Sequence, residues 1–515
     1  MLPMSLLPRR RSLRATVAGV TIAGLVLTVG GCSRQVDGEA TTAGAGASAP
    51  VAWEPCQLNA PATIEVPEGT ECGLLAVPVD YDVADGDSLD LALIRFPATG
   101  EKIGSLVFNP GGPGESGIEA AFGLLPTLPP EIREHFDFVG FDPRGVASSS
   151  PALWCNSDAD NDRQRAEPVI EYTQEGVDYL NEQTQEYVQR CIDKMGVDFL
   201  ANVGTDNVAR DLDRIRQAVG DEKLTFLGYS YGTRIGTTYA EMYPQNVRAM
   251  ILDGAIDPNA DPVEADIAQA AAFQSAFDDF AADCATSPDC PLGTDPAKAV
   301  EVYRDLLDPW QQTPAPTADP RGLSHYDATT ATIMALYSPT LWRHLTQGLA
   351  ELREGRGDTL LILADLYMRR DGNGHYTNAT DVRMAVNCMD EQRVTDMATL
   401  VDEDRRLREV APFLATGEFT GLVPEPTCNK WPVPPTSEPH ELSVPDLPAT
   451  LVVSITGDPA TPYEAGVKLA DQLGGGLVTF KGTQHTVVFR GNSCVDDYAV
   501  KYLVDGAVPG PDTEC

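Results

Sequence analysis

Basic residues are scarce in this sequence. Its 515 residues include 37 Lys and Arg against 76 Asp and Glu, which gives a formal net charge of −39 at pH 7. A surface of this sign repels polyanions, so nucleic acids and anionic lipid surfaces are poor candidates for partners. The balance favours substrates that carry a positive charge, such as a peptide with a free N-terminus. Plain solubility outside a cell is the alternative explanation of the acidic excess.

Motifs for metals and nucleotides are also missing. The sequence contains no CxxC pair and no cysteine at zinc-site spacing from a histidine. It contains no GxxxxGK[ST] loop for phosphate binding. We therefore expect neither a metal nor an organic cofactor.

Long apolar runs are absent except near the N-terminus. The run ATVAGVTIAGLVLTV, residues 15–29, follows four arginines and leads into Gly30-Gly31-Cys32. It is shorter than the roughly 20 residues that a membrane helix needs. An export signal has this order, and its end resembles a bacterial lipoprotein box. We predict that residues 1–32 are a lipoprotein signal and that Cys32 is lipidated, which anchors the protein to the outer face of the cytoplasmic membrane. A plain secretory signal is the alternative, and RRRSLR leaves Sec and Tat export both open.

Cysteine usage agrees with export. Without Cys32 the 11 cysteines leave an even set. An even set in an exported chain favours disulfides, because oxidising compartments preserve them. We predict pairing of nearest neighbours along the chain, within the set Cys56, Cys72, Cys155, Cys191, Cys284, Cys290, Cys388, Cys428, Cys494 and Cys515.

The full sequence has the composition of a globular protein, with 43% hydrophobic and 22% charged residues. A tether of small and polar residues, 33–50, precedes the folded part. Eight apolar runs alternate with helical patterns, which predicts an α/β fold with an eight-stranded, mostly parallel sheet. The expected strands are at 73–81, 89–98, 105–111, 136–145, 224–230, 248–257, 449–458 and 477–485.

Two stretches interrupt this alternation. Residues 150–202 form a small polar insertion, and residues 261–445 form a long one that is rich in helical pattern and proline. We predict that the long insertion is a mainly helical cap between strands six and seven. The catalytic domain then consists of 51–260 and 446–515.

The sequence Gly228-Tyr229-Ser230-Tyr231-Gly232 joins an expected strand to an expected helix. A G-x-S-x-G motif in this context is typical of a nucleophile elbow, a sharp turn that exposes a serine above the sheet. Side chains in place of the two glycines would collide with neighbouring elements. The pattern therefore predicts that Ser230 is a nucleophile.

A serine nucleophile needs a base, and the base needs an orienting acid. Hydrolases with this elbow place the acid and then the histidine after the serine. Of six histidines, His485 is the one at the end of the last expected strand, and Asp458 is at the end of the strand before it. We predict His485 as the base and Asp458 as the acid. Asp253, after the sixth strand, is the alternative acid.

The remaining site residues support the reaction or bind substrate. Backbone amides of Tyr231 and of Gly112, in the glycine-rich loop NPGGPGES, are expected to form the oxyanion hole. Thr461 is expected to support Asp458 or to begin a helix, and Arg144 to be a structural ion pair. Three acids are candidate contacts for a substrate amine, namely Glu115, Asp390 and Glu391.

The segments NPGGPGESG, FDPRGVASSSP, GYSYGTRIG and TGDPATPYEAG with GTQHTVVF together resemble a known family. The chain is similar to the exported tripeptidyl-aminopeptidase-like α/β-hydrolases of actinobacteria from about Val51 onward. Relatives have HGGPG at the oxyanion loop, where this chain has Pro110 in place of the histidine. The resemblance implies an α/β-hydrolase fold and a Ser230, Asp458 and His485 triad.

From these features we expect a serine hydrolase of the cell envelope that cleaves peptides, either as an aminopeptidase near a free N-terminus, with a tripeptidyl enzyme as one option, or as an endopeptidase. A carboxylesterase or lipase is the alternative, since the same residues cleave esters. An inactive hydrolase fold that acts as a binding protein is a third possibility, which the complete triad disfavours. The sequence leaves the oligomeric state open.

Overall fold

The structure is a computed structural model, which describes residues 50–56, 66–510 and 513–515. Cys32, the predicted signal and most of the predicted tether lie outside the described residues. In these described ranges no helix is long and apolar enough to cross a bilayer.

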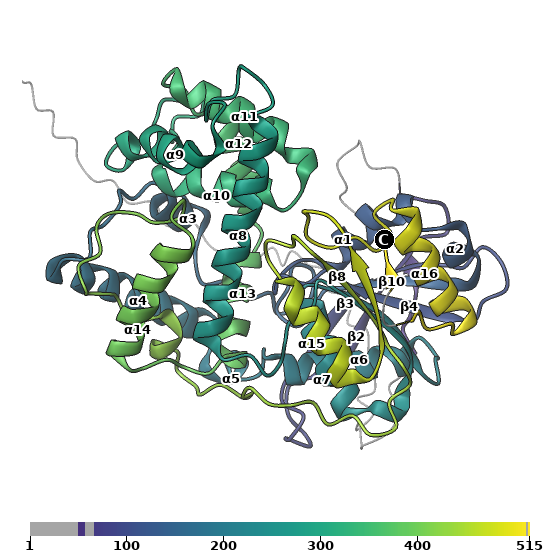
Figure 1. Cartoon of the computed structure of the whole chain (residues 1–515). Helices are drawn as coiled ribbons and strands as arrows, with labels where there is room; N and C mark the ends of the chain where they lie inside the picture. Colours follow the sequence, from purple (N-terminus) through teal and green to yellow (C-terminus); the bar gives the residue numbers. More distant parts are fainter. Residues whose placement is uncertain (1–49, 57–65, 511–512) are drawn as a thin grey trace, which may run out of the picture. The chain divides into compact units, whose positions relative to one another are not determined.

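A ten-stranded sheet forms the centre of the protein, in the order β1-β2-β3-β5-β4-β6-β7-β8-β9-β10 (Figure 1). The strands are β1 (Glu54–Pro55), β2 (Glu71–Pro78), β3 (Ser88–Phe96), β4 (Gly104–Asn109), β5 (Phe136–Phe141), β6 (Leu224–Tyr229), β7 (Val247–Asp253), β8 (Leu451–Ile455), β9 (Gly476–Phe480) and β10 (Thr513–Glu514).

The sheet contains all eight predicted strands and two more. The additional strands, β1 and β10, have two residues each, too few for a hydrophobic pattern. Each lies at an edge and ends beside a disulfide, Cys56–Cys72 for β1 and Cys494–Cys515 for β10. The predicted count of eight was therefore wrong, because these short edges depend on covalent links and not on side-chain alternation.

In the spatial order of the sheet, neighbouring strands within the series β5, β4, β6, β7, β8, β9 and β10 run parallel. The pairs β1–β2, β2–β3 and β3–β5 are antiparallel. Parallel strands require crossover connections, and helices supply them. The carboxyl ends of β4, β6, β7 and β8 consequently meet at one edge, where ligands bind in open α/β sheets.

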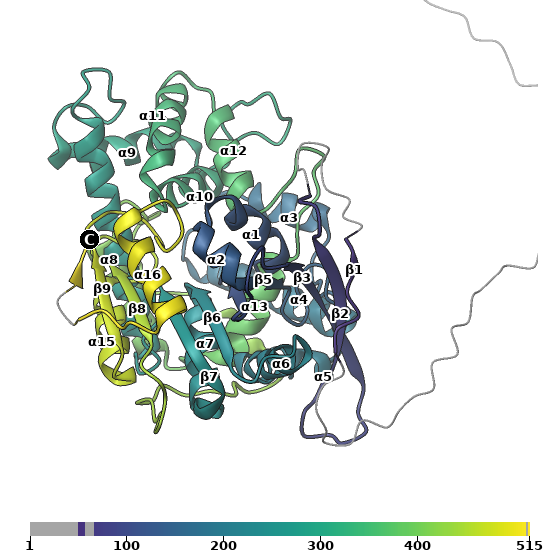
Figure 2. The same ribbon diagram turned by 90° about the vertical axis from the view of Figure 1, so that its right-hand side faces the viewer.

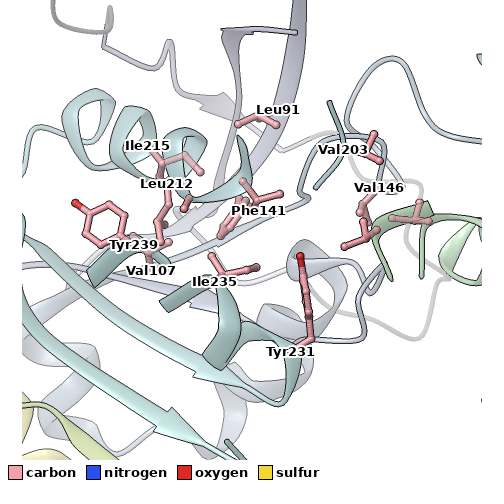
Figure 3. Packing of buried hydrophobic residues seen from close by; sticks show 14 of the residues in the cluster. Leu91, Val107, Phe141, Val146, Val203, Leu212, Ile215, Tyr231, Ile235 and Tyr239 are labelled. Carbon is pink, nitrogen blue, oxygen red and sulfur yellow. The ribbon is translucent and has the colours of Figure 1, made fainter. Parts of the chain in front are cut away.

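Both faces of the sheet are covered. Alternate residues point to opposite faces, so Leu106 and Phe108 join one buried cluster while Val107 joins the other. Helices α1 (Gly117–Leu124), α2 (Pro130–His135) and α16 (Ser493–Asp505) contribute to the first cluster. Helices α6 (Thr205–Ala218), α7 (Tyr231–Met242) and α15 (Tyr463–Leu473) contribute to the second. Figure 2 shows α1, α2 and α16 together, away from α6 and α7, and Figure 3 shows part of the second cluster.

The small insertion forms α3 (Asp158–Arg165), α4 (Gln174–Met195) and α5 (Val197–Leu200), tied by the Cys155–Cys191 disulfide. The structure also contains Cys284–Cys290 and Cys388–Cys428. With the two edge disulfides, this confirms nearest-neighbour pairing for all ten cysteines.

The long insertion between β7 and β8 is helical, as its pattern predicts. Its helices are α8 (Pro262–Cys284), α9 (Ala299–Leu307), α10 (His325–Leu336), α11 (Pro339–Arg353), α12 (Asp358–Tyr367), α13 (Ala379–Asp390) and α14 (Met397–Val410). The described residues also contain five short 3₁₀ helices, of which the first two precede the insertion, at Leu125–Thr127, Pro244–Asn246, Pro296–Lys298, Asp308–Trp310 and Thr427–Lys430. A third buried cluster, built around Phe277, Phe280 and Tyr303, lies almost wholly within this insertion. The proposed boundary of the cap at 261 and 445 stays a prediction.

Candidate active site

Ser230 lies at a sharp turn between β6 and α7, with φ 52° and ψ −123°. A positive φ is costly for a non-glycine residue and is maintained only where the surroundings enforce it. A Cβ on Gly228 would lie 2.5 Å from the Gly232 oxygen, and a Cβ on Gly232 would lie 2.8 Å from the Asn109 oxygen. Both positions therefore exclude any larger residue. The strained turn exposes Ser230 to a cavity of about 1260 Å³.

Asp458 and His485 come together beside this turn. His485 Nδ1 lies 2.9 Å from Asp458 Oδ1 and 3.0 Å from Oδ2. Because a carboxylate only accepts, Nδ1 carries the proton, which leaves Nε2 of a neutral ring free to accept one. The Asp458 side chain is buried and also accepts hydrogen bonds from the Ala460 and Thr461 amides at 2.9 Å. The carboxylate is thus rigidly held.

Thr461 supports the acid as one of its two expected roles requires. Its hydroxyl donates to Asp458 Oδ2 at 2.9 Å and lies 3.4 Å from His485 Nδ1. Thr461 precedes α15 by two residues, so it does not begin that helix. The structure favours the supporting role.

Asp253, the alternative acid, lies at the end of β7 and does not bond to His485. Its Oδ2 accepts the Val487 and Val488 amides at 2.7 and 2.8 Å. It therefore holds the loop that carries His485. Burial raises the pKa of the Asp253 carboxyl to about 6, although the two amides act to lower it.

Ser230 and His485 share no hydrogen bond among the residues that the structure describes. The His485 amide donates to the Tyr337 carbonyl oxygen at 3.0 Å, and the two rings meet edge to face at 5.3 Å. Catalytic hydrogen bonds are frequently loose in a site without substrate and tighten when substrate binds. Tyr337 comes from the long insertion and lines the cavity with Ser230.

Gly254 is a second contact that the sequence analysis missed. Its φ is +68°, and a Cβ there would lie 3.2 Å from His485 Cε1 and 3.0 Å from Thr461 Oγ1. The chain therefore passes directly against the imidazole. Neither Gly254 nor Tyr337 belongs to a local motif, so only a search for contacts in the folded chain finds them.

The glycine-rich loop after β4 lies against the elbow. A Cβ on Gly111 would lie 2.9 Å from Ser230 Cβ and 3.0 Å from the Tyr231 nitrogen. Gly112 has φ +107° and lines the cavity beside Ser230. In the described part of the chain neither the Gly112 nor the Tyr231 amide donates to a protein group. Both predicted oxyanion donors are therefore available at the nucleophile.

The three acids proposed to contact an amine have different surroundings. Glu115 pairs with Arg369 at 2.7 Å. Asp390 is buried and accepts hydrogen bonds from the Thr205 amide and hydroxyl, and Thr205 in turn bonds to the Tyr231 hydroxyl. Asp390 therefore supports the nucleophile turn through Thr205 and Tyr231. Asp390 and Glu391 both line the cavity, but the Glu391 carboxylate has no hydrogen-bond or ion-pair partner in the described residues.

Acidic residues dominate the cavity around Glu391. Desolvation raises the pKa of Glu391 to about 7, with Asp266 and Asp390 contributing in the same direction and Arg234 opposing them. Burial likewise raises the pKa of Asp206. The other acids that line the cavity are Glu241, Asp257, Asp261, Glu264, Glu438, Glu441, Glu464 and Asp471. This lining attracts cations.

Arg144 is structural, as predicted. It forms a bidentate pair with Asp211, at 2.8 Å through Nε and 2.7 Å through Nη2, and both side chains are fully buried. Its Nη1 also donates to the Val79 and Asn202 carbonyl oxygens. It joins the sheet edge to α6 and makes no contact with the triad.

The sheet topology, the elbow and the acid–histidine pair define a class. The sequence profile of the alpha/beta hydrolase fold matches residues 104–491, and the chain belongs to this family. It is a serine hydrolase.

Three relatives are similar to this chain over most of its length. It is 60% identical to serine protease Hip1 of Mycobacterium tuberculosis, over 99% of this chain and 100% of the relative. Carboxylesterase B of the same species is 48% identical over 99% and 100%. Tripeptidyl aminopeptidase of Streptomyces coelicolor is 30% identical over 94% and 89%. The predicted resemblance is thereby confirmed.

Proposed function

We propose that this serine hydrolase cleaves peptide bonds with Ser230, His485 and Asp458 as its triad. The observation that carries the proposal is the buried Asp458 carboxylate on His485 Nδ1, beside a serine forced into a positive-φ turn. This arrangement leaves Nε2 as the base for the serine hydroxyl. Identity to a serine protease supports the peptide substrate.

In the first half-reaction Ser230 Oγ bonds to the substrate carbonyl carbon as its proton passes to His485 Nε2. The carbonyl oxygen becomes an oxyanion, which the Tyr231 and Gly112 amides stabilise. The C–N bond then breaks, and Nε2 gives its proton to the leaving amine. Asp458 stabilises the imidazolium throughout this step.

In the second half-reaction water attacks the acyl-enzyme and gives a proton to Nε2. The bond between the acyl carbon and Ser230 Oγ breaks, and the proton returns to the serine. The products are a carboxylic acid and an amine, and no redox change occurs.

The acidic cavity supports a substrate with a free amine. Glu391 and Asp206 line it together with Ser230, so an ammonium group there would be paired with carboxylates. We therefore propose cleavage near a peptide N-terminus, with Glu391 in place of Glu115 and Asp390 as the amine contact. A tripeptidyl aminopeptidase among the relatives is consistent with this proposal.

We further propose that Cys32 carries a lipid anchor and that the protein is located in the cell envelope. Cys32→Ala should release the protein from the membrane fraction, and mass spectrometry of the native protein should find a diacylglyceryl group on an N-terminal Cys32. An unmodified N-terminus elsewhere would replace the anchor with a plain secretory signal.

Ser230→Ala tests the chemistry. Loss of the nucleophile should lower kcat by on the order of 10⁶, and fluorophosphonate should label the native protein but not the variant. Full hydrolysis by a folded Ser230→Ala protein would sink the proposal. Peptides with free and acetylated N-termini then test the amine contact, since Glu391→Gln should lower kcat/KM for the free amine alone.

Carboxylesterase activity is the second candidate, because a carboxylesterase is 48% identical to this chain. A panel of peptidyl amides and acyl esters of several chain lengths separates the two. Esters have the better leaving group, so the comparison is made on kcat/KM against each substrate's uncatalysed rate.

A further inference from the structure

Arg383 is a partly buried cation on α13 that lacks a counter-ion. In the described part of the chain it forms no ion pair, whereas the neighbouring arginines Arg369 and Arg370 pair with Glu115 and Asp162. Removing a charge from water without pairing it costs free energy. A guanidinium kept in this state is a candidate for pairing with a ligand.

One tyrosine, Tyr367, contacts this guanidinium, and Tyr326 and Tyr337 influence its pKa. Its central carbon lies 5.8 Å from the ring centroid of Tyr367. Burial acts to lower the pKa of Arg383, and Tyr367, Tyr326 and Tyr337 outweigh it, so the pKa is raised. The group therefore stays charged. Tyr326 is 49% exposed, which leaves the cluster open to solvent.

Tyr337 connects this cluster to the reaction centre. Its ring lies 6.2 Å from the Tyr367 ring on one side and 5.3 Å from the His485 ring on the other. It also lines the cavity with Ser230. One aromatic side chain thus separates the guanidinium cluster from the catalytic histidine.

Helix α13 begins at the oxyanion loop and carries Arg383 one turn further along. A Cβ on Gly114 would lie 2.4 Å from the Ala379 oxygen, so the first residue of the helix touches that loop. Residues four apart share a helix face, which puts Arg383 one turn beyond Ala379 and Asn387 one turn further. Asn387 lines the cavity. The helix face therefore runs along the site from the loop to the acids.

Charge changes sign along this site. Glu391 and Asp206 line the cavity, whereas Arg383, Tyr326 and Tyr367 are outside that lining in the described residues. If the cavity takes the amine-bearing acyl half of the substrate, the half that leaves lies on the other side of Ser230. Arg383 is a cation without an ion pair in the described residues, on the helix that begins at the oxyanion loop.

We propose that Arg383 and the tyrosines Tyr326, Tyr337 and Tyr367 form a subsite for a carboxylate on the leaving-group half of the substrate. The carboxylate is a C-terminus or the side chain of Asp or Glu close to the scissile bond. The preferred substrate is then dipolar, with its amine in the acidic cavity and its carboxylate on Arg383. This inference rests on the proposed peptidase function and adds the specificity on the leaving side.

The test compares two peptides that differ only by Asp or Asn after the scissile bond. The native protein should prefer Asp by about 10- to 100-fold in kcat/KM, the range for a charged hydrogen bond. Arg383→Met should abolish the preference and Arg383→Lys should keep part of it. Arg369→Met is the matched control, an arginine of the same insertion whose partner is Glu115, and it should retain the preference.

A purely structural Arg383 gives a different result. In that case Arg383→Met lowers kcat/KM for both peptides by the same factor, and the proposal is overturned. A preference for a carboxylate on the acyl half that disappears with Arg383 overturns the assignment to the leaving side. Equal labelling of Ser230 by fluorophosphonate in all variants verifies that the catalytic centre is intact.

Calorimetry separates this proposal from the hydrolytic one. The folded Ser230→Ala protein should bind the Asp peptide about 10-fold more tightly than the Asn peptide, without any cleavage. Equal affinities overturn the subsite even when Arg383→Met fails to fold. If the native protein cleaves neither peptide but Ser230→Ala shows the preference, peptide hydrolysis fails and the subsite stands.

Discussion

Two aspartates at neighbouring strand ends show how similar surroundings lead to different roles. Asp253 ends β7 and Asp458 follows β8, the strand that pairs with β7 in parallel. Both are buried and both accept two backbone amides. Asp458 also receives His485 Nδ1–H, whereas Asp253 receives the amides of Val487 and Val488, two and three residues beyond that histidine.

The comparison separates orienting a ring from holding a loop. Asp253 also joins the two halves of the site, since its main-chain oxygen accepts the Ser230 amide at 2.9 Å. Thr486, between the histidine and the held amides, has φ 62°, a conformation that Asp253 helps to maintain. Burial and hydrogen bonds alone do not make a carboxylate the catalytic acid. The catalytic acid is the carboxylate that accepts the hydrogen bond from His485 Nδ1.

Asp458→Asn should give the largest effect. The neutral amide has no charge to stabilise the imidazolium, and its NH₂ group can donate to Nδ1 and hold the ring in the wrong tautomer, so kcat should fall about 10⁴-fold. Steady-state kinetics on a chromogenic substrate measure this, with the melting temperature as the check on folding. A large fall in Asp253→Asn together with a small fall in Asp458→Asn would mean that the roles of the two acids are reversed.

Gly254→Ala should cause the second-largest loss of activity, because Gly254 lies against both Thr461 and the His485 ring. The methyl group would lie 3.2 Å from His485 Cε1, and φ is +68°. Displacing a catalytic group by about 1 Å costs roughly 10²-fold in rate. We expect kcat to fall by about that factor while fluorophosphonate still labels Ser230 slowly. Gly220→Ala, at φ +86° with open space around it, is the control for backbone strain alone.

Asp253→Asn should lower kcat by only about 10-fold. The amide oxygen can still accept one or both loop amides, but the NH₂ group then occupies a buried position where Oδ1 has no partner in the described structure. Asp253→Ala removes both acceptors and should cost about 1–3 kcal/mol per orphaned amide in unfolding free energy. Chemical denaturation compares the two variants. Equal stability of both would contradict the loop-holding role.

The smallest effect concerns pH. Burial raises the pKa of Asp253 from 3.8 to about 6, so the folded protein binds this proton more tightly than the unfolded chain. The contribution of the group to stability is therefore full below about pH 4 and is lost as pH rises to about 6. Relative to Asp253→Asn, the native protein should lose on the order of 2 to 3 kcal/mol over that range. Denaturation curves at several pH values test this, and a difference that rises with pH would refute it.

Much of the site followed from local pattern. The elbow is recognisable because a strand, two glycines around a serine, and a helix lie within about twenty residues of sequence. Asp458 and His485 follow from the order of elements in hydrolases with this elbow. The disulfides join near neighbours along the chain, which is why pairing by proximity succeeded.

Contacts between distant residues were not predictable in this way. Tyr337 meets His485 across 148 residues (485 − 337) of chain. Asp390 was predicted to contact an amine, yet it supports Tyr231 through Thr205, 185 residues away. The Glu115 carboxylate was likewise predicted to contact an amine, yet it pairs with Arg369, 254 residues away. An acidic side chain looks the same in sequence whether solvent, a substrate or a distant arginine faces it.

The sequence by itself determined the alternating elements, the nucleophile and the order of its catalytic partners, because strand, turn and helix preferences act over short stretches of chain. Only the tertiary structure decided which of two aspartates meets the histidine, which carboxylates are paired with a cation, and that Arg383 forms no ion pair in the described residues. Those outcomes depend on side chains that folding brings within a few ångströms, where burial and pairing set the free energy of each charge.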